Sequence, residues 1–155
     1  MTELYASAML DHDVDRVWAV VRDFHGLALW QPAVAASAMG APAAGRAVRV
    51  LTMADGATVV ESLAALDDSD RSLVYEIVTS PYPVQHYRGR LELRPVTSIG
   101  ATFIGWSIVV NAHPDDATDL IESLRQGILH RGLRGLAAHL DASTGSSDLS
   151  SKKTS

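Results

Sequence analysis

The sequence predicts an α+β fold in which a curved antiparallel sheet of about seven strands holds one long C-terminal helix, with two short helices after the first strand. Three observations support this fold class. Apolar and polar residues alternate in successive segments between residues 33 and 111, and turn-forming residues separate the segments. A helical apolar stripe follows, from residue 114 to about residue 140. The chain contains no internal repeat, and we place a single domain at residues 1–141.

The N-terminal elements precede the main run of strands. Residues 4–9 are short and apolar, as expected of a first strand. Asp13 is a favourable N-terminal cap for a helix over residues 14–22. Residues 27–30 are expected to form a second short helix, which ends before Pro32 because proline disfavours a helical residue in front of it.

Six further strands are predicted from alternation and turns. The clearest alternation is in the fifth of them, where Tyr87 and Leu91 point inward while the arginines between them point outward. In the last strand, Ile104 and Trp106 belong to the bulkier face. The expected strands cover residues 33–39, 47–53, 58–66, 72–79, 85–94 and about 101–111.

The final helix is expected to begin at Pro114, which can occupy the first helical position. Three glycines lie within it, Gly127, Gly132 and Gly135, and each costs about 1 kcal/mol relative to alanine. Close packing of the helix on the sheet would explain them, and so would space left for a ligand. Both interpretations place the sheet against this face. The predicted apolar stripe comprises Ala117, Leu120, Ile121, Leu124, Ile128, Gly132, Leu133 and Leu136.

Composition excludes several classes of function. The chain has 155 residues and a net charge of −5, which does not favour a nucleic-acid surface. It contains no cysteine, and its histidines do not have the spacing of a metal motif. No apolar stretch approaches the ~20 residues of a membrane helix. We expect a cytoplasmic protein, a monomer or homodimer without metal or cofactor, with a flexible polar tail at residues 142–155.

Glu61 is the most informative residue, because the predicted hairpin turns it inward. Asp55-Gly56 is a preferred pair for a two-residue loop, and such a loop pairs Val50 with Glu61. Arg49 then points to solvent. A lone buried carboxylate costs several kcal/mol unless it is paired, protonated or hydrated. A ligand cavity that holds water would hydrate such a carboxylate, and this would explain a glutamate on the inner face.

The predicted inner face combines an apolar lining with a few polar groups, which is typical of a small-molecule pocket. In the alternative, a filled core, the hydroxyl groups of Tyr75 and Tyr87 satisfy Glu61. Glu61 and Tyr87 are also candidate catalytic residues, as a general acid or base and as a donor to a developing oxyanion. The candidate ligand-binding residues are Trp30, Val50, Val59, Glu61, Leu63, Tyr75, Ile77, Tyr82, Tyr87, Ile104, Trp106, Leu124, Ile128 and Gly132.

Five motifs, in this order and spacing, resemble a known superfamily. They are Val17–Phe24, Trp30–Pro32, Glu61–Asp68, His86–Gly89 and Gly132–Leu136. The chain resembles the helix-grip fold of START-related lipid-transfer domains, birch-pollen-allergen-like proteins and bacterial polyketide cyclase/dehydrases (the SRPBCC superfamily). The resemblance extends from about residue 3 to residue 140.

The resemblance adds an expectation for the site. In plant abscisic-acid receptors of this superfamily, a similar strand places its glutamate in the cavity, and a tyrosine of a following strand does the same. These positions are similar to Glu61 and Tyr87. The pocket lysine of those receptors has no counterpart here, and their gate loops are not matched by residues 53–56 or 80–83. The resemblance therefore implies a cavity with a polar floor and not a hormone receptor.

Three hypotheses of function follow. The first is a protein that binds a hydrophobic small molecule, such as a lipid or polyketide, between the sheet and the last helix. The second is a polyketide cyclase, aromatase or dehydratase that uses Glu61 without a cofactor. The third is a module that interacts with another protein.

Overall fold

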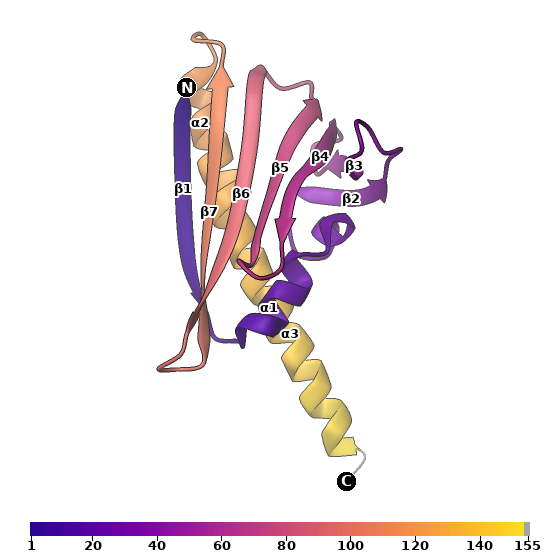
Figure 1. The fold of residues 1–155 in the computed structure, drawn as a ribbon, viewed down its shortest axis with the longest axis vertical. Coiled ribbons are helices and arrows are strands. Elements are labelled where there is room, and N and C mark those ends of the chain that lie inside the picture. The colour runs from indigo at the N-terminus through magenta and orange to yellow at the C-terminus, as the bar shows by residue number, and fades with distance from the viewer. Residues whose placement is uncertain (154–155) are drawn as a thin grey trace.

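A computed structural model describes the backbone of residues 1–153 and the side chains of residues 1–143. Seven strands alternate with short helices and are followed by a continuous helical region (Figure 1). The strands are β1 (Thr2–Leu10), β2 (Val34–Met39), β3 (Val48–Met53), β4 (Thr58–Asp67), β5 (Ser72–Thr79), β6 (Val84–Val96) and β7 (Ala101–Ala112). The helices are α1 (Val14–Val21), the 3-10 helix η1 (Phe24–Leu29), α2 (Ala117–Ser123), the π-helical segment η2 (Leu124–His130) and α3 (Arg131–Lys153).

All seven strands belong to one antiparallel sheet in the order β1-β7-β6-β5-β4-β3-β2. Consecutive strands are neighbours except β1, which pairs with β7 at the edge of the sheet. The C-terminal helical region crosses one face of this sheet, and α1 lies beside it (Figure 1). Asp13 caps α1 by accepting a hydrogen bond from the backbone N–H of Asp15 at 3.1 Å. The predicted α+β class, with a long C-terminal helix held by the sheet, is confirmed.

The C-terminal helical region differs from the single α-helix predicted. Its fully or nearly fully buried residues are spaced by five at Leu124–Leu129 and by three or four at Leu133, Leu136 and Leu140. A spacing of five matches the wider turn of a π-helix, and η2 begins at Leu124. The predicted stripe used an α-helical period throughout, so it placed Ile128, which is half-buried, where Leu129 is buried.

Helix α3 continues to Lys153, past the predicted domain end at residue 141. Residues 142–153 are therefore helical, whereas residues 154–155 lie outside the described part. The flexibility of the 142–155 tail stays a prediction. No helix in residues 1–153 combines the length and apolarity needed to cross a membrane.

The β3–β4 hairpin has a different register from the one predicted. Its loop contains three residues, because the backbone of Met53 hydrogen-bonds to Ala57 and Gly56 adopts a left-handed conformation with φ +90°. Arg49 consequently pairs with Glu61, where the two-residue loop predicted Val50. Glu61 lies on the inner face in either register. The prediction that Arg49 faces solvent was wrong, since its side chain is buried beside Glu61.

Candidate functional site

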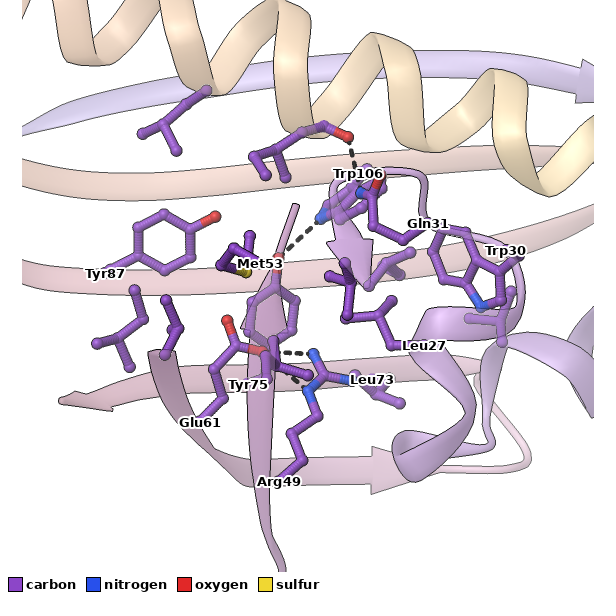
Figure 2. Close-up of a pocket in the computed structure, with 18 of the residues that line it drawn as sticks. Leu27, Trp30, Gln31, Arg49, Met53, Glu61, Leu73, Tyr75, Tyr87 and Trp106 are labelled. Atoms are coloured by element: carbon purple, nitrogen blue, oxygen red, sulfur yellow. Dashed lines mark hydrogen bonds and ion pairs between the residues drawn. The ribbon is translucent and has the colours of Figure 1, made fainter. Parts of the chain in front are cut away.

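A cavity of about 60 Å³ lies between the inner face of the sheet, η1 and the C-terminal helical region (Figure 2). Its walls are mostly apolar, and its polar side chains come from strands β3 to β7, from the β5–β6 loop and from the residues on either side of η1. The lining residues are Val21, Asp23, Leu27, Trp30, Gln31, Val34, Arg49, Leu51, Met53, Val59, Glu61, Leu73, Tyr75, Ile77, Tyr82, Tyr87, Leu91, Trp106, Leu124 and Ile128.

Arg49 and Glu61 form a buried ion pair in the cavity wall. Oε1 of Glu61 accepts a hydrogen bond from Nε of Arg49 at 2.8 Å and lies 2.7 Å from Nη2 in the ion pair. Nη1 of Arg49 donates to the carbonyl oxygen of Phe24 at 2.9 Å, and the guanidinium lies 4.1 Å from the centre of the Phe24 ring. Removing the two charged groups from water costs free energy. The ion pair offsets part of this cost because the charges neutralise each other, and the hydrogen bonds to Glu61 and Phe24 use N–H donors of the guanidinium. Glu61 is therefore paired rather than alone.

The second oxygen of Glu61 remains available. Both contacts from Arg49 go to Oε1, and within residues 1–143 no hydrogen bond to Oε2 is formed. Figure 2 shows Glu61 and Tyr87 arranged around the same space. A ligand hydroxyl or an enolisable C–H in that space could donate to Oε2 of Glu61.

Two buried phenols supply donors to the cavity. Nε1 of Trp106 donates to the hydroxyl oxygen of Tyr75 at 3.1 Å, which leaves the Tyr75 proton free to be donated. The rings of Tyr75 and Tyr87 lie 6.2 Å apart. Burial raises the pKa of Tyr75 and of Tyr87 above the ordinary value of 10.0. Both phenols therefore stay protonated near neutral pH.

Gly89 explains how the Tyr75 ring reaches its position. Gly89 pairs with Tyr75 across β5 and β6, and the ring lies where a side chain at Gly89 would be. A Cβ atom there would overlap the phenol. The glycine thus allows an aromatic ring to lie flat across the sheet on the floor of the cavity.

A vestibule of about 250 Å³ adjoins the cavity. Four residues line both spaces: Met53, Tyr82, Leu124 and Ile128. The hydroxyl group of Tyr82 donates to Oδ2 of Asp55 at 3.2 Å and so joins the β5–β6 loop to the β3–β4 loop. These four side chains are the common wall of the two spaces. The vestibule is lined by Ala33, Met53, Ala54, Asp55, Tyr82, Leu120, Ser123, Leu124, Gly127, Ile128 and Arg131.

Comparison with known proteins identifies the family. A family model described as polyketide cyclase / dehydrase and lipid transport matches residues 1–141. The chain belongs to this family. No curated protein matches it.

Solved structures with this fold span most of the chain. XoxI from Bacillus cereus has a TM-score of 0.77 at 26% identity, covering 92% of this chain and 99% of its own. The Zhui aromatase/cyclase from Streptomyces has a TM-score of 0.67 at 19% identity, covering 91% and 92%. A START superfamily protein from Mycobacterium smegmatis has a TM-score of 0.75 at 12% identity, covering 90% and 97%. The last two similarities concern the fold alone.

Most of the residues that we predicted to bind ligand line the cavity of this family member. Four do not. Val50 faces away because of the register of the hairpin, and Leu63, next to a β-bulge, packs on the core outside the cavity. Ile104 is wholly buried in the core. Gly132 is covered by the side chains of Gln31 and Trp106, so it serves close packing and leaves no space for a ligand. The roles of the lining residues in binding or catalysis stay predictions.

Asp23, Gln31 and Arg49 are the polar lining residues that the sequence did not indicate. The correct hairpin register would have identified Arg49 together with Leu51 and Met53. Gln31 is 1% exposed, and its Nε2 donates to the carbonyl oxygen of Ile128 in the π-helical segment at 3.1 Å. Backbone carbonyl groups pair with different N–H groups in a π-helix than in an α-helix, and the sequence pattern did not predict the π-helical segment.

Within residues 1–143 no group of side chains has the composition of a metal site.

The buried phenols predict unfolding at alkaline pH. The pKa values of Tyr75 and Tyr87 are raised in the folded state, so their contribution to stability is fully present below about pH 10 and is lost as the pH rises toward the folded-state pKa values. We expect tyrosinate absorbance to rise cooperatively with the loss of circular dichroism. Tyr87→Phe should reduce the amplitude of that step. Ionisation of all four tyrosines while the fold is intact would contradict this prediction.

Proposed function

We propose that the protein binds a hydrophobic small molecule, such as a lipid, a polyketide or a similar metabolite, in the cavity between the sheet and the C-terminal helical region. The main support is the combination of an apolar lining with a buried ion pair and two protonated phenols. Such a surface selects a ligand that is apolar over most of its length and carries a hydroxyl or carbonyl group at the end that enters first.

The polar groups divide the recognition between them. A ligand carbonyl could accept from the hydroxyl group of Tyr75 or Tyr87, and a ligand hydroxyl could donate to Oε2 of Glu61. The charge of Arg49 is already compensated, so the inner end of the ligand is expected to be neutral. Each hydrogen bond would contribute about 0.5–1.5 kcal/mol, or more where the acceptor is the carboxylate.

Native mass spectrometry of the purified protein tests this proposal. We expect a fraction of the protein to carry a non-covalently bound small molecule that is released on denaturation. The released compound should rebind the emptied protein with a stoichiometry of one. If the protein is empty, and neither lipid nor polyketide extracts raise its melting temperature, the binding function is contradicted.

A second function, cyclisation or dehydration of a poly-β-ketone, also has an observation in its favour. The free Oε2 of Glu61 and the phenol of Tyr87 line the same cavity, so a base and a donor for an enolate oxygen face one space. In that role Glu61 would remove a proton from a carbon between two carbonyl groups, and the phenol would stabilise the resulting negative charge on oxygen.

Glu61→Gln separates binding from catalysis. If Glu61 only binds, the variant should lose about 1–3 kcal/mol of binding free energy, and any turnover should remain proportional to occupancy. If Glu61 transfers a proton, turnover at saturating substrate should be lost. Glu61→Gln leaves the buried charge of Arg49 without its counter-charge and should lower the melting temperature. Both measurements therefore need a temperature at which the variant is folded. Unchanged affinity and unchanged turnover would contradict both roles.

A further inference from the structure

The cavity is too small for a ligand of ordinary size. Its volume is about 60 Å³, enough for a few water molecules, whereas ligand pockets typically measure ~300–1,000 Å³. The vestibule adds about 250 Å³. Because four side chains line both spaces, a ligand that fills the cavity extends past them into the vestibule. The outer end of the ligand is therefore recognised by the vestibule wall.

Arg131 provides a charge on that wall, and no partner for it lies among the side chains of residues 1–143. Among residues 1–143, most arginines contact a carboxylate or a carbonyl oxygen, as Arg125 does with Glu122. Arg131 has no such contact within this part of the chain, and neither has Arg134 one turn further on. Only Arg131 of these two lines the vestibule.

The surroundings of Arg131 leave room for a ligand group. Gly127 lies four residues earlier in the helical region and also lines the vestibule, and a Cβ atom there would meet no atom within 4 Å. Asp55 is the acidic residue of the vestibule. Its two carboxylate oxygens already accept hydrogen bonds from the Tyr82 hydroxyl and the backbone N–H of Ala57. The guanidinium of Arg131 is thus the positively charged group of this wall that is free to bind an anion, and the wall also carries the hydroxyl group of Ser123.

We propose that the ligand is an amphipathic acid whose apolar tail enters the cavity and whose carboxylate lies in the vestibule beside Arg131. This inference rests on the proposed binding function and adds the charge and the orientation of the ligand. Arginine binds carboxylates through paired N–H donors, so the contact would fix the head of the ligand as well as attract it.

Calorimetric titration with decanoic acid and 1-decanol tests the inference, because the two share a tail and differ in the carboxylate. We expect Arg131→Gln to weaken decanoate binding about three- to tenfold, the range for a charged hydrogen bond at a partly exposed site. Decanol binding should not change. Arg134→Gln is the matched control, since it removes the same charge from the same helix outside the vestibule, and it should alter neither affinity.

The outcomes separate this inference from the binding function. If both ligands bind and Arg131→Gln leaves decanoate affinity unchanged, the Arg131 site is excluded while the cavity proposal stands. An equal loss in Arg134→Gln would show general charge attraction and would also exclude the site. If neither ligand binds the unaltered protein, or raises its melting temperature, both proposals are contradicted for ligands of this class.

Discussion

Arg49→Met should destabilise the fold by about 3–5 kcal/mol, because it leaves the carboxylate of Glu61 buried without its partner. The carbonyl oxygen of Phe24 would lose its hydrogen bond at the same time. A domain of this size is stable by about 5–15 kcal/mol, so the loss is a large part of the total. Denaturant titration monitored by circular dichroism measures it.

Arg88→Met is the control for this substitution. Arg88 also pairs with a glutamate on the same sheet, Glu76, at 2.7 Å, but 57% of its side chain is exposed. An exposed pair contributes about 0–1 kcal/mol, so this variant should remain close to the unaltered protein. Equal effects of the two arginine substitutions would contradict the assignment of a costly buried charge.

A double variant shows what the ion pair is for. Arg49→Met with Glu61→Leu removes both charges and replaces them with apolar volume, which in other proteins is often neutral or stabilising. We expect the double variant to recover most of the stability lost by Arg49→Met and to bind ligand poorly. That result would mean that the pair is kept for recognition at a cost in stability. Recovery of neither stability nor binding would favour a purely structural role.

The fold class could be predicted from the sequence because the strands have a period of two and the last helix a continuous apolar stripe. The alternation of β6 placed Tyr87 and Leu91 on the inner face, and both are buried there. The helical period failed where the chain becomes π-helical at Leu124. The hydrogen bond from Gln31 to the carbonyl oxygen of Ile128 joins residues 97 positions apart, so no local sequence pattern could predict it.

The site could be predicted in part. Glu61 was placed inside because the predicted register paired it with Val50, which was expected to point inward. In the structure its partner is Arg49, and Arg49 rather than Val50 points inward, so the two differences cancel for Glu61. Arg49 was missed because Asp-Gly permits both a two-residue loop and a three-residue loop with Gly56 at positive φ. One residue of loop length decides whether Glu61 faces Val50 or a guanidinium. The ion pair therefore depends on a local backbone choice that the sequence leaves open.

Gly135→Ala should destabilise the protein by about 3 kcal/mol although alanine is the better helix former. A Cβ atom at this position would overlap the carbonyl oxygen of Trp30 and approach the ring of Pro32 to within 2.6 Å. The backbone oxygen cannot move without displacing the segment that carries Trp30 and Gln31, two residues of the cavity wall. Thermal and denaturant unfolding would both show the loss.

Gly127→Ala should stabilise the protein, whereas Gly135→Ala should destabilise it. Nothing lies within 4 Å of a Cβ atom at Gly127, so the substitution should add up to about 1 kcal/mol of stability. The two variants change the same atoms in the same helical region, and their difference therefore isolates the contact with Trp30 and Pro32. If Gly135→Ala is as stable as Gly127→Ala, that contact does not hold the helix. If the signs differ as expected, the segment from Trp30 to Pro32 fixes the depth of the helix over the cavity, and with it the space left for a ligand.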